Sequence, residues 1–224
     1  ELISVAKDAG IRSEVYHLKL AGKNNWHLFD RVTGRIDSAR KAGLEITADM
    51  YTYNACATGL DIIMPTWVQE GGYTEWVPRL KNPGLRKQAG EFIRQRILDS
   101  PGSAENVLFT GFRNDSLRKL TGKTLAQVAA ERNKPVEETA MDLVIENGAD
   151  VGTVYFNMSE ENVKKQIALP WMCFCSDAGS LATEGVFLKS GTHPRAYGSF
   201  ARLLGKYVRD EKVIPLEEAI RKLT

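Results

Sequence analysis

Two basic side chains, His17 and Lys19, stand two positions apart in a segment that alternates like a β-strand. Side chains two apart on a strand point to the same face of the sheet. An imidazole there can ligate a metal ion, and an ammonium group can bind an anion. A hydrogen-bonded histidine on a half-buried strand is the competing interpretation, and the spacing alone favours that one.

A carboxylate follows a second strand-like run, because Asp177 comes just after the apolar residues 171–175. At a strand end over a cleft, Asp177 is placed to act as a metal ligand or a general base. Asp is equally common in the turns that end strands. Tyr51, close behind Asp49 in another β-type run, can donate a hydrogen bond into a site or simply fill space. The residues alone leave both choices open.

The segment His193-Pro194-Arg195 combines a fixed backbone with a planar cation. Proline restricts the local geometry, and a guanidinium fork matches a carboxylate. A structural arginine near a helix N-terminus is an equally good interpretation. His27, at the start of a predicted helix, is better explained by a surface or capping role.

Cys173 and Cys175 share one face of the strand-like run, where two thiolates could hold a soft metal ion. No second pair of ligands follows at the spacing of a zinc site. Apolar packing is therefore the expected role of both residues, and of Cys56.

These residues lie among alternating strand and helix signals. Strands are expected at 13–19, 45–51, 106–110, 151–156 and 171–175. Helices are expected at 26–42, 61–72, 85–98, 125–132, 136–147, 159–168, 197–209 and 216–223. Such alternation favours a parallel sheet or a (β/α) barrel, in which the carboxyl ends of the strands line the active site. The strands are too few for a closed barrel, and no glycine-rich turn indicates a nucleotide-binding sheet.

The chain has 224 residues, of which 43% are hydrophobic and 26% charged, with a net charge of +2. This length suits one domain or a large piece of one. With 30 Lys and Arg against 28 Asp and Glu, the net charge produces almost no electrostatic field that would attract nucleic acid or an anionic membrane. No apolar run is long enough for a membrane span. Three cysteines do not make a disulfide framework, so a reducing, cytoplasmic compartment is expected.

Both ends have the pattern of cuts inside a longer protein. Residues 1–10 look like the end of an amphipathic helix that stops at Gly10, and residues 215–224 begin a helix that the chain barely completes. We therefore expect residues 1–224 to be a fragment of a single domain, truncated on both sides.

Several of these signals occur in the order of a known family. The matching blocks are His17-Leu18-Lys19, Ala48-Asp49-Met50-Tyr51-Thr52-Tyr53, Ser176-Asp177, His193-Pro194-Arg195-Ala196-Tyr197-Gly198-Ser199-Phe200 and Leu204-Gly205-Lys206-Tyr207-Val208-Arg209. From about Val15 to its end, the chain resembles the N-acyl-D-amino-acid deacylases (D-aminoacylases), a branch of the amidohydrolase superfamily. The His-Pro-Arg block and its spacing to Ser176-Asp177 are the most specific parts.

The resemblance implies an α/β fold, the C-terminal half of a partial (β/α)₈ TIM-type barrel, in one catalytic domain. It implies zinc-dependent hydrolysis of N-acyl-D-amino acids, with one or two ions in the full-length family. His17 and Asp177 would ligate zinc, and Asp177 would act first as general base and then as general acid. The substrate-binding residues that the resemblance implies are Lys19 and Arg195 for the carboxylate, Tyr51 near the scissile carbonyl, and His193.

The match has two departures, because Thr52 stands where the family has Pro and Ala178 where it has Gly. The family's His-x-His pair, its bridging Cys and a further His have no counterpart in these residues. A catalytic zinc site takes about three protein ligands, so we expect the chain alone to bind zinc poorly and to have little activity. An open half-barrel exposes strand edges, which predicts self-association.

Two other functions stay open. A cyclic-amide hydrolase of the hydantoinase or dihydroorotase kind would not need a carboxylate clamp, so loss of D-acyl-amino-acid turnover in Arg195→Ala would argue against it. A non-catalytic module that binds a small molecule could keep the same framework. The kinetics of Asp177→Ala in the full-length protein would decide between that module and an enzyme.

Overall fold

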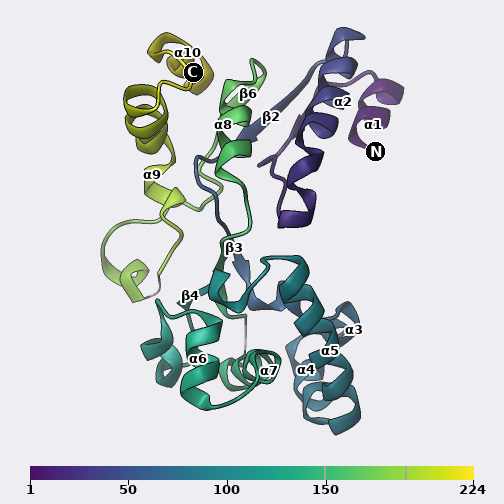
Figure 1. The fold of residues 1–224 in the computed structure, drawn as a ribbon, viewed down its shortest axis with the longest axis vertical. Coiled ribbons are helices and arrows are strands. Elements are labelled where there is room, and N and C mark those ends of the chain that lie inside the picture. Colours follow the sequence, from purple (N-terminus) through teal and green to yellow (C-terminus); the bar gives the residue numbers. More distant parts are fainter. Residues whose placement is uncertain (149, 190) are drawn as a thin grey trace. The chain divides into compact units, whose positions relative to one another are not determined.

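The computed structural model describes residues 1–148, 150–189 and 191–224. The described residues form two compact units (Figure 1). Unit 1 consists of Glu1–Asn54, Met158–Leu181 and Pro194–Thr224, and unit 2 of Ala55–Asn157 and Ala182–His193. A catalytic domain can contain more than one compact unit, so the single domain expected over residues 1–224 stays a prediction.

Unit 1 is built on a parallel sheet that has three strands among its described residues, in the order β1-β2-β6. The strands are β1 Ser13–Val15, β2 Ile46–Met50 and β6 Met172–Phe174. Val15 lies opposite Ala48, and Phe174 lies opposite Met50. The carboxyl ends of these strands therefore meet at one edge, which confirms the parallel pairing expected for these three runs.

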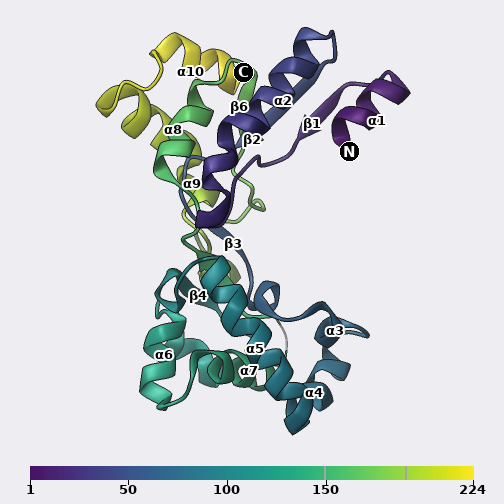
Figure 2. The same ribbon diagram turned by 45° about the vertical axis from the view of Figure 1, so that its right-hand side comes forward.

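Helices pack against this sheet on its apolar side. The helices of unit 1 are α1 Leu2–Ala9, the 3₁₀ helix η1 Lys23–Leu28, α2 Phe29–Lys41, α8 Glu160–Ala168, α9 Arg195–Arg202, the π-helix η6 Leu203–Asp210 and α10 Leu216–Leu223. α1 contacts β1, α2 contacts β2, and α8 contacts β6 (Figure 2). Ile46, Ala48 and Met50 of β2 are buried, whereas Thr47 between them is exposed. The alternation along β2 thus separates a packed face from a polar one.

Unit 2 contains a different sheet, antiparallel, with three strands among its described residues in the order β3-β5-β4. These strands are β3 Cys56–Gly59, β4 Val107–Gly111 and β5 Gly152–Tyr155. The parallel pairing expected for the runs at 106–110 and 151–156 is therefore wrong, because β4 and β3 both run antiparallel to β5. β3 is a further strand that the sequence does not predict, because its short sequence Cys-Ala-Thr-Gly carries no β-type pattern.

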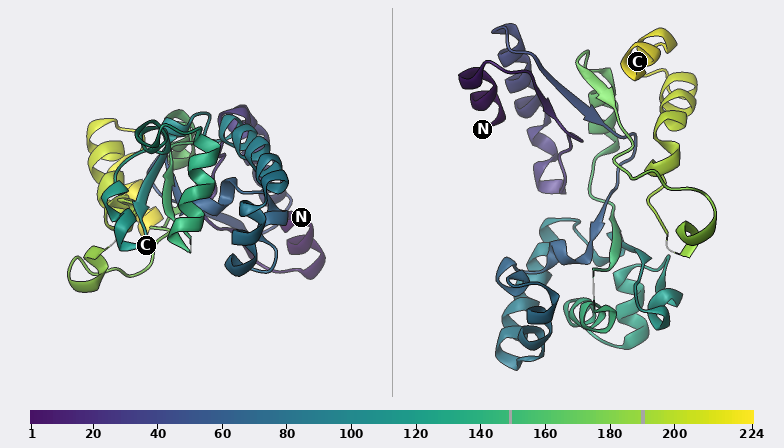
Figure 3. Two further views of the ribbon diagram at one scale, coloured as in Figure 1. Left: turned by 90° about the horizontal axis from the view of Figure 1, so that it is seen from below. Right: turned by 180° about the vertical axis from the view of Figure 1, so that it is seen from behind.

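The helices of unit 2 enclose an apolar core. They are η2 Leu60–Ile63, α3 Thr66–Gln69, α4 Tyr73–Lys81, α5 Pro83–Asp99, η3 Ala104–Asn106, η4 Asp115–Leu120, α6 Leu125–Arg132 and α7 Val136–Asn147. A further 3₁₀ helix of this unit, η5 Gly185–Lys189, contributes none of its described side chains to the core. α4 and α5 lie side by side, and α5 also contacts α7 (Figures 1 and 3). Ile93, Phe109 and Leu143 are each 0% exposed in this core.

Local sequence signals place some helix ends correctly. Thr124 accepts the Gln127 N–H at 3.2 Å and donates its own N–H to the Gln127 side chain, which forms the capping box that starts α6. The sequence does not predict α4, because Pro78 lies inside it and is typical of a helix break. Among the described residues, no helix combines the length and the apolar character that a membrane crossing requires.

Candidate active site

His17 and Lys19 lie beyond the end of β1, because the strand stops at Val15. The backbone of His17 is left-handed, with φ of 41°. The regular alternation of a strand does not pass through such a residue, so the prediction that His17 and Lys19 share one strand face is wrong. Both residues are half-buried in the turn that follows the carboxyl end of β1.

Asp49, near the end of β2, ties together the segments that follow the two outer strands. Its Oδ1 accepts the backbone N–H of His17 at 2.5 Å and the thiol of Cys175 at 3.1 Å. Asp49 is only 8% exposed. A residue other than glycine with positive φ is uncommon. The hydrogen bond from the N–H of His17 to Asp49 helps to hold His17 in that conformation. Asp49 therefore fixes the turn after β1 and the loop after β6 to the central strand.

Asp177 lies in the loop after β6, and its backbone is also left-handed, with φ of 47°. Its Oδ1 accepts the hydroxyl of Tyr16 at 3.1 Å, and its Oδ2 lies 2.7 Å from Nη1 of Arg195. The hydrogen bond to Asp177 and the charge of that carboxylate raise the pKa of the Tyr16 phenol. The carboxylate is thus held between a phenol and a guanidinium group.

Arg195, the first residue of α9, stacks on Tyr51. The Cζ atom of Arg195 lies 4.6 Å from the centre of the Tyr51 ring, and Nζ of Lys19 lies 5.2 Å from the same centre. Tyr51 and Arg195 are 3% and 7% exposed. Cations are attracted to an aromatic face by the ring quadrupole. The structure therefore brings four predicted site residues together, Asp177, Arg195, Tyr51 and Lys19.

The two remaining predicted site residues have other surroundings. The ring of His17 lies against that of Tyr16, with 4.5 Å between the ring centres. His193 belongs to unit 2, where its buried Nε2 lies 3.0 Å from the carbonyl oxygen of Ala55. A ring bonded to the backbone in this way is an ordinary arrangement for a structural histidine. Zinc binding by His17 and substrate binding by His193 stay predictions.

The thiols of Cys173 and Cys175 contact polar groups of the neighbouring strands. Sγ of Cys173 lies 3.3 Å from the carbonyl oxygen of Ala48 and 3.7 Å from Oε1 of Glu14. Burial, followed by the hydrogen bond to Asp49, raises the pKa of the Cys175 thiol to about 12. Burial likewise raises the pKa of the Cys173 thiol. The apolar packing expected from the sequence is therefore wrong for these two thiols, which are half-buried and contact polar groups.

The described part of the chain contains no group of three or more His, Cys, Asp or Glu side chains arranged to hold a metal ion. The oxygens of Asp177 already contact Tyr16 and Arg195. Because a catalytic zinc site takes about three protein ligands, the residues of this chain do not by themselves fit a zinc centre. No catalytic step through a metal follows from them.

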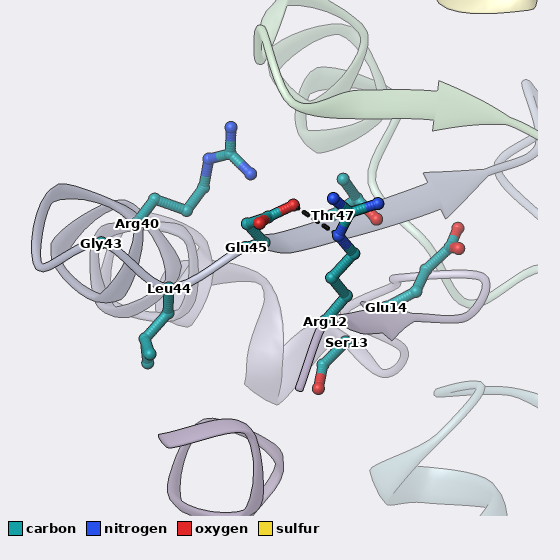
Figure 4. A pocket seen from close by; sticks show the side chains of 8 residues that line it. All are labelled: Arg12, Ser13, Glu14, Arg40, Gly43, Leu44, Glu45 and Thr47. Carbon is teal, nitrogen blue, oxygen red and sulfur yellow. Dashed lines mark ion pairs between the residues drawn. The ribbon is translucent and has the colours of Figure 1, made fainter. Parts of the chain in front are cut away.

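A pocket opens at the other ends of the same strands, beside Ser13 of β1 and Thr47 of β2 (Figure 4). Nε of Arg12 pairs there with Glu45 at 2.7 Å. The side chains of this pair are 84% and 66% exposed, so water screens the interaction strongly. This pocket contains none of the predicted site residues. The candidate active site is therefore the carboxyl edge of the parallel sheet in unit 1.

Solved structures define the class of fold. The chain aligns over 99% of its length with an N-acyl-D-glutamate deacylase from Bordetella bronchiseptica, with a TM-score of 0.68 and 23% identity. It aligns over 100% of its length with a D-aminoacylase described as defining a novel subset of amidohydrolases, with a TM-score of 0.67 and 24% identity. The chain covers 36% of each of those proteins. Its fold therefore matches part of the fold of these two proteins.

Curated relatives point to the same proteins. An N-acyl-D-glutamate deacylase from Alcaligenes xylosoxydans xylosoxydans is 25% identical over 224 residues, which is all of this chain and 36% of the relative. A D-aminoacylase from that organism is 35% identical over 107 residues, 47% of this chain and 19% of the relative. No family model matches the chain. The resemblance to N-acyl-D-amino-acid deacylases is confirmed along the whole chain, which spans about a third of the length of the first of these relatives.

Some of the solved relatives are described with metals. The Bordetella enzyme was crystallised with zinc and with a phosphonate inhibitor that mimics the tetrahedral intermediate of its reaction. A D-aminoacylase structure was solved to study the functional role of a binuclear metal centre. The zinc expected from the sequence is therefore found in a relative of this chain.

Tyr16, Asp49 and Thr52 are parts of the site to which the sequence patterns assign no role. A signal existed for Asp49, because a carboxylate in an apolar strand must find hydrogen-bond partners when it is buried. Tyr16 gave no such signal. Its contact with Asp177 depends on the turn at His17, which residue types do not reveal.

Proposed function

We propose that residues 1–224 are part of a hydrolase that cleaves the linear amide of N-acyl-D-amino acids into a D-amino acid and a carboxylate. One observation carries the proposal: the ion pair of Asp177 with Arg195, beside Tyr51 and Lys19, at the carboxyl edge of a parallel sheet. Parallel α/β folds place their active sites at that edge. Similarity to an N-acyl-D-glutamate deacylase along the whole of this chain supports the same reaction class.

The substrate carboxylate is bound by Arg195 and Lys19. Their cationic groups lie 4.6 and 5.2 Å from the centre of one ring, that of Tyr51. A guanidinium group has five N–H donors in a planar fork, so it can hold Asp177 and a substrate carboxylate together. Two cations that fix the carboxylate leave one orientation at the chiral carbon, which gives a preference for one enantiomer.

Asp177 is the proton carrier. Hydrolysis requires that the attacking water lose a proton and that the leaving nitrogen gain one. The carboxylate of Asp177 takes the proton as the water oxygen bonds to the acyl carbon, and it delivers the proton to nitrogen as the C–N bond breaks. Tyr16 and Arg195 hold the carboxylate in place for both steps.

We also propose that unit 1 supplies strands of a (β/α)₈ barrel, with His17 and Asp177 as its contribution to a zinc centre. The other ligands would come from residues outside 1–224, which agrees with the chain covering 36% of the deacylase from Alcaligenes. The isolated 224-residue chain should then bind zinc poorly. Equilibrium dialysis that finds one tightly held zinc ion per chain would overturn this ligand assignment.

Strand edges support a further proposal, that the isolated chain associates with itself. Among the described residues, β1 and β6 each pair only with β2, so each leaves one edge unpaired. Unpaired edges are templates for pairing with another chain. Size-exclusion chromatography of the 224-residue chain should show dimers or larger species, and a clean monomer would contradict the proposal.

The reaction is tested with the full-length protein on N-acetyl-D-alanine, N-acetyl-D-leucine, N-acetyl-D-glutamate and their L-enantiomers. We expect kcat/KM to favour the D form by at least about 100-fold. Arg195→Ala should raise KM for the carboxylate substrates by about 10- to 100-fold. Arg12→Ala, which removes an exposed arginine at the other end of the sheet, is the matched control.

Two outcomes would reject the proposal. Turnover of a hydantoin or of dihydroorotate, without turnover of the acyl amino acids, would indicate a cyclic-amide hydrolase. Binding of N-acetyl-D-amino acids without any hydrolysis would indicate a non-catalytic module.

A further inference from the structure

One face of α9 holds the segment that follows β2. Arg195, Ser199 and Arg202 are spaced so that they lie along the same side of the helix. They contact residues 51–53 in sequence order: the first stacks on residue 51, the second bonds to residue 52, and the third stacks on residue 53. The helix and the segment are therefore in register, one residue of the segment for each turn of the helix.

Thr52 is the centre of this register. Its Oγ1 donates a hydrogen bond to the carbonyl oxygen of Ser199 at 2.7 Å. Its own carbonyl oxygen accepts Nε of Arg202 at 2.8 Å and the hydroxyl of Tyr207 at 3.4 Å. Thr52 is 0% exposed. Both polar ends of a buried residue are thus used to join β2 to the C-terminal helices.

The hydrogen bonds continue from Thr52 to the residue that pairs with Asp177. Ser199, which is 1% exposed, donates its Oγ to the carbonyl oxygen of Arg195 at 2.9 Å. Thr52 directly follows Tyr51, on whose ring Arg195 stacks. The position of Arg195 relative to Tyr51 is therefore set twice, by ring stacking and by the hydrogen bond of Thr52. Stacking tolerates sliding, whereas a short hydrogen bond to a backbone carbonyl does not.

Gly198 shows how closely α9 approaches the segment. A Cβ atom added at Gly198 would overlap the hydroxyl oxygen of Tyr53. That hydroxyl lies 3.5 Å from the carbonyl oxygen of Pro194. Glycine at position 198 therefore lets α9 lie directly against the Tyr53 side chain.

We propose that Thr52 is a positioning residue for the substrate carboxylate, which it serves by fixing Arg195 against Tyr51. The inference rests on the proposed function, because it takes Arg195 as the carboxylate binder. Thr52 reaches no reacting atom. Its loss therefore weakens the binding of anionic substrates and leaves the chemical step nearly unchanged.

The test compares Thr52→Val, which keeps the side-chain shape without the hydroxyl, with Thr52→Ser, which keeps the hydroxyl. KM and kcat are measured in the full-length protein on the best substrate of the N-acetyl-D-amino-acid panel. The carboxamide of that substrate serves as a competitive inhibitor that lacks the anion. Thr52→Val should raise KM by about 3- to 10-fold with kcat within about twofold of wild type. Thr52→Ser should stay within about twofold in both, and Ki of the carboxamide should not change.

An unchanged KM in Thr52→Val would overturn the inference. So would an equal weakening of substrate and carboxamide, because that result indicates a general structural defect. Circular dichroism verifies folding, and Thr52→Ala, with the same expectations, replaces Thr52→Val if the latter does not fold. The wild-type enzyme is measured first, so an absence of turnover there rejects the proposed function, and this inference with it, before any variant is compared.

Discussion

Units 1 and 2 bury different kinds of side chain around their sheets. In unit 1 the carboxyl edge of the sheet buries Asp49, Thr52 and Arg195, each with hydrogen-bonded or charged partners. In unit 2 the main cluster around the antiparallel sheet is apolar, as at Phe109 and Leu143. Buried polar groups add little net stability even when they are paired, whereas apolar burial is the main source of it. Substitutions at the edge in unit 1 should therefore change the reaction, and substitutions in the core of unit 2 should change stability.

The largest effect is expected at the carboxylate of unit 1. Asp177→Asn keeps the shape and removes the proton acceptor, so kcat of the full-length protein should fall by about 10²- to 10⁴-fold. The thermal unfolding midpoint should fall as well, because the buried Arg195 loses the charge with which it pairs. Glu45→Gln, an exposed member of the Arg12 pair, is the control. A kcat within tenfold of wild type would show that Asp177 is not the group that transfers the proton.

The matching substitution in unit 2 should act on stability. Phe109→Ala removes a ring that is 0% exposed and should lower the free energy of unfolding by about 3–5 kcal/mol. Phe92→Ala, at a ring that is 45% exposed in the same unit, should cost well under about 1 kcal/mol. Urea denaturation measures both. Equal losses in the two variants would show that the apolar cluster is not the stabilising core.

One glycine in each unit extends the comparison, because replacement by alanine should change the free energy of unfolding in opposite directions at the two positions. At Gly59 in unit 2, a Cβ atom would overlap carboxylate oxygens of Asp61 and Asp150, so Gly59→Ala should cost about 1–3 kcal/mol. At Gly34, inside α2 of unit 1, a Cβ atom meets nothing within 4 Å. Gly34→Ala should therefore stabilise by about 0.5–1 kcal/mol. Differential scanning calorimetry that gives shifts of the same sign would contradict the packing at Gly59.

The smallest expected effect is a pH dependence in unit 2. Burial, followed by the charge of Asp61, raises the pKa of Asp150 to about 6. An ordinary Asp titrates near 3.9, so the folded chain holds this proton more tightly than the unfolded chain does. The resulting stabilisation is fully present below about pH 4 and is lost as the pH rises through about 6. Asp150 is only partly desolvated and stays accessible to solvent, so screening by water should keep the effect within about 1 kcal/mol.

Asp61→Asn isolates that effect from other titrating groups. The variant removes the neighbouring charge, so its stability should fall less than that of wild type between pH 4 and pH 7. Urea denaturation at both pH values gives the difference. Identical pH dependence in the two proteins would show that the carboxyls do not interact.

The fold could be predicted where a segment carried its own signal. The run at β2 alternates apolar and polar residues, and Thr124 lies directly before an apolar helix with Gln127 at the capping-box position. β3 could not be predicted, because Cys-Ala-Thr-Gly has the composition of a loop and becomes a strand through its pairing with β5. The antiparallel pairing of β4 with β5 could not be predicted either, because the helices between these strands are also what a parallel crossover contains.

The candidate site also has parts that the sequence predicts and parts that it does not. Tyr51 and Asp177 meet because both follow strands that end at one edge of a parallel sheet, whereas Arg195 comes from the start of α9 and only the motif order indicates its place in advance. The roles of Asp49 and Thr52 depend on backbone groups, the N–H of His17 and the carbonyl of Ser199. Every residue type offers those groups, so the sequence does not reveal which of them will be used.

The central claim is that Asp177 and Arg195 act as one unit. A double-mutant cycle measures this in the full-length protein, from kcat/KM on the best N-acetyl-D-amino acid for wild type, Asp177→Asn, Arg195→Gln and the double variant. Because the two groups are 2.7 Å apart, we expect the double variant to be at least about tenfold more active than the product of the two single losses predicts. If the loss in kcat/KM of the double variant equals the product of the two single losses, Asp177 and Arg195 act independently and the claim is wrong.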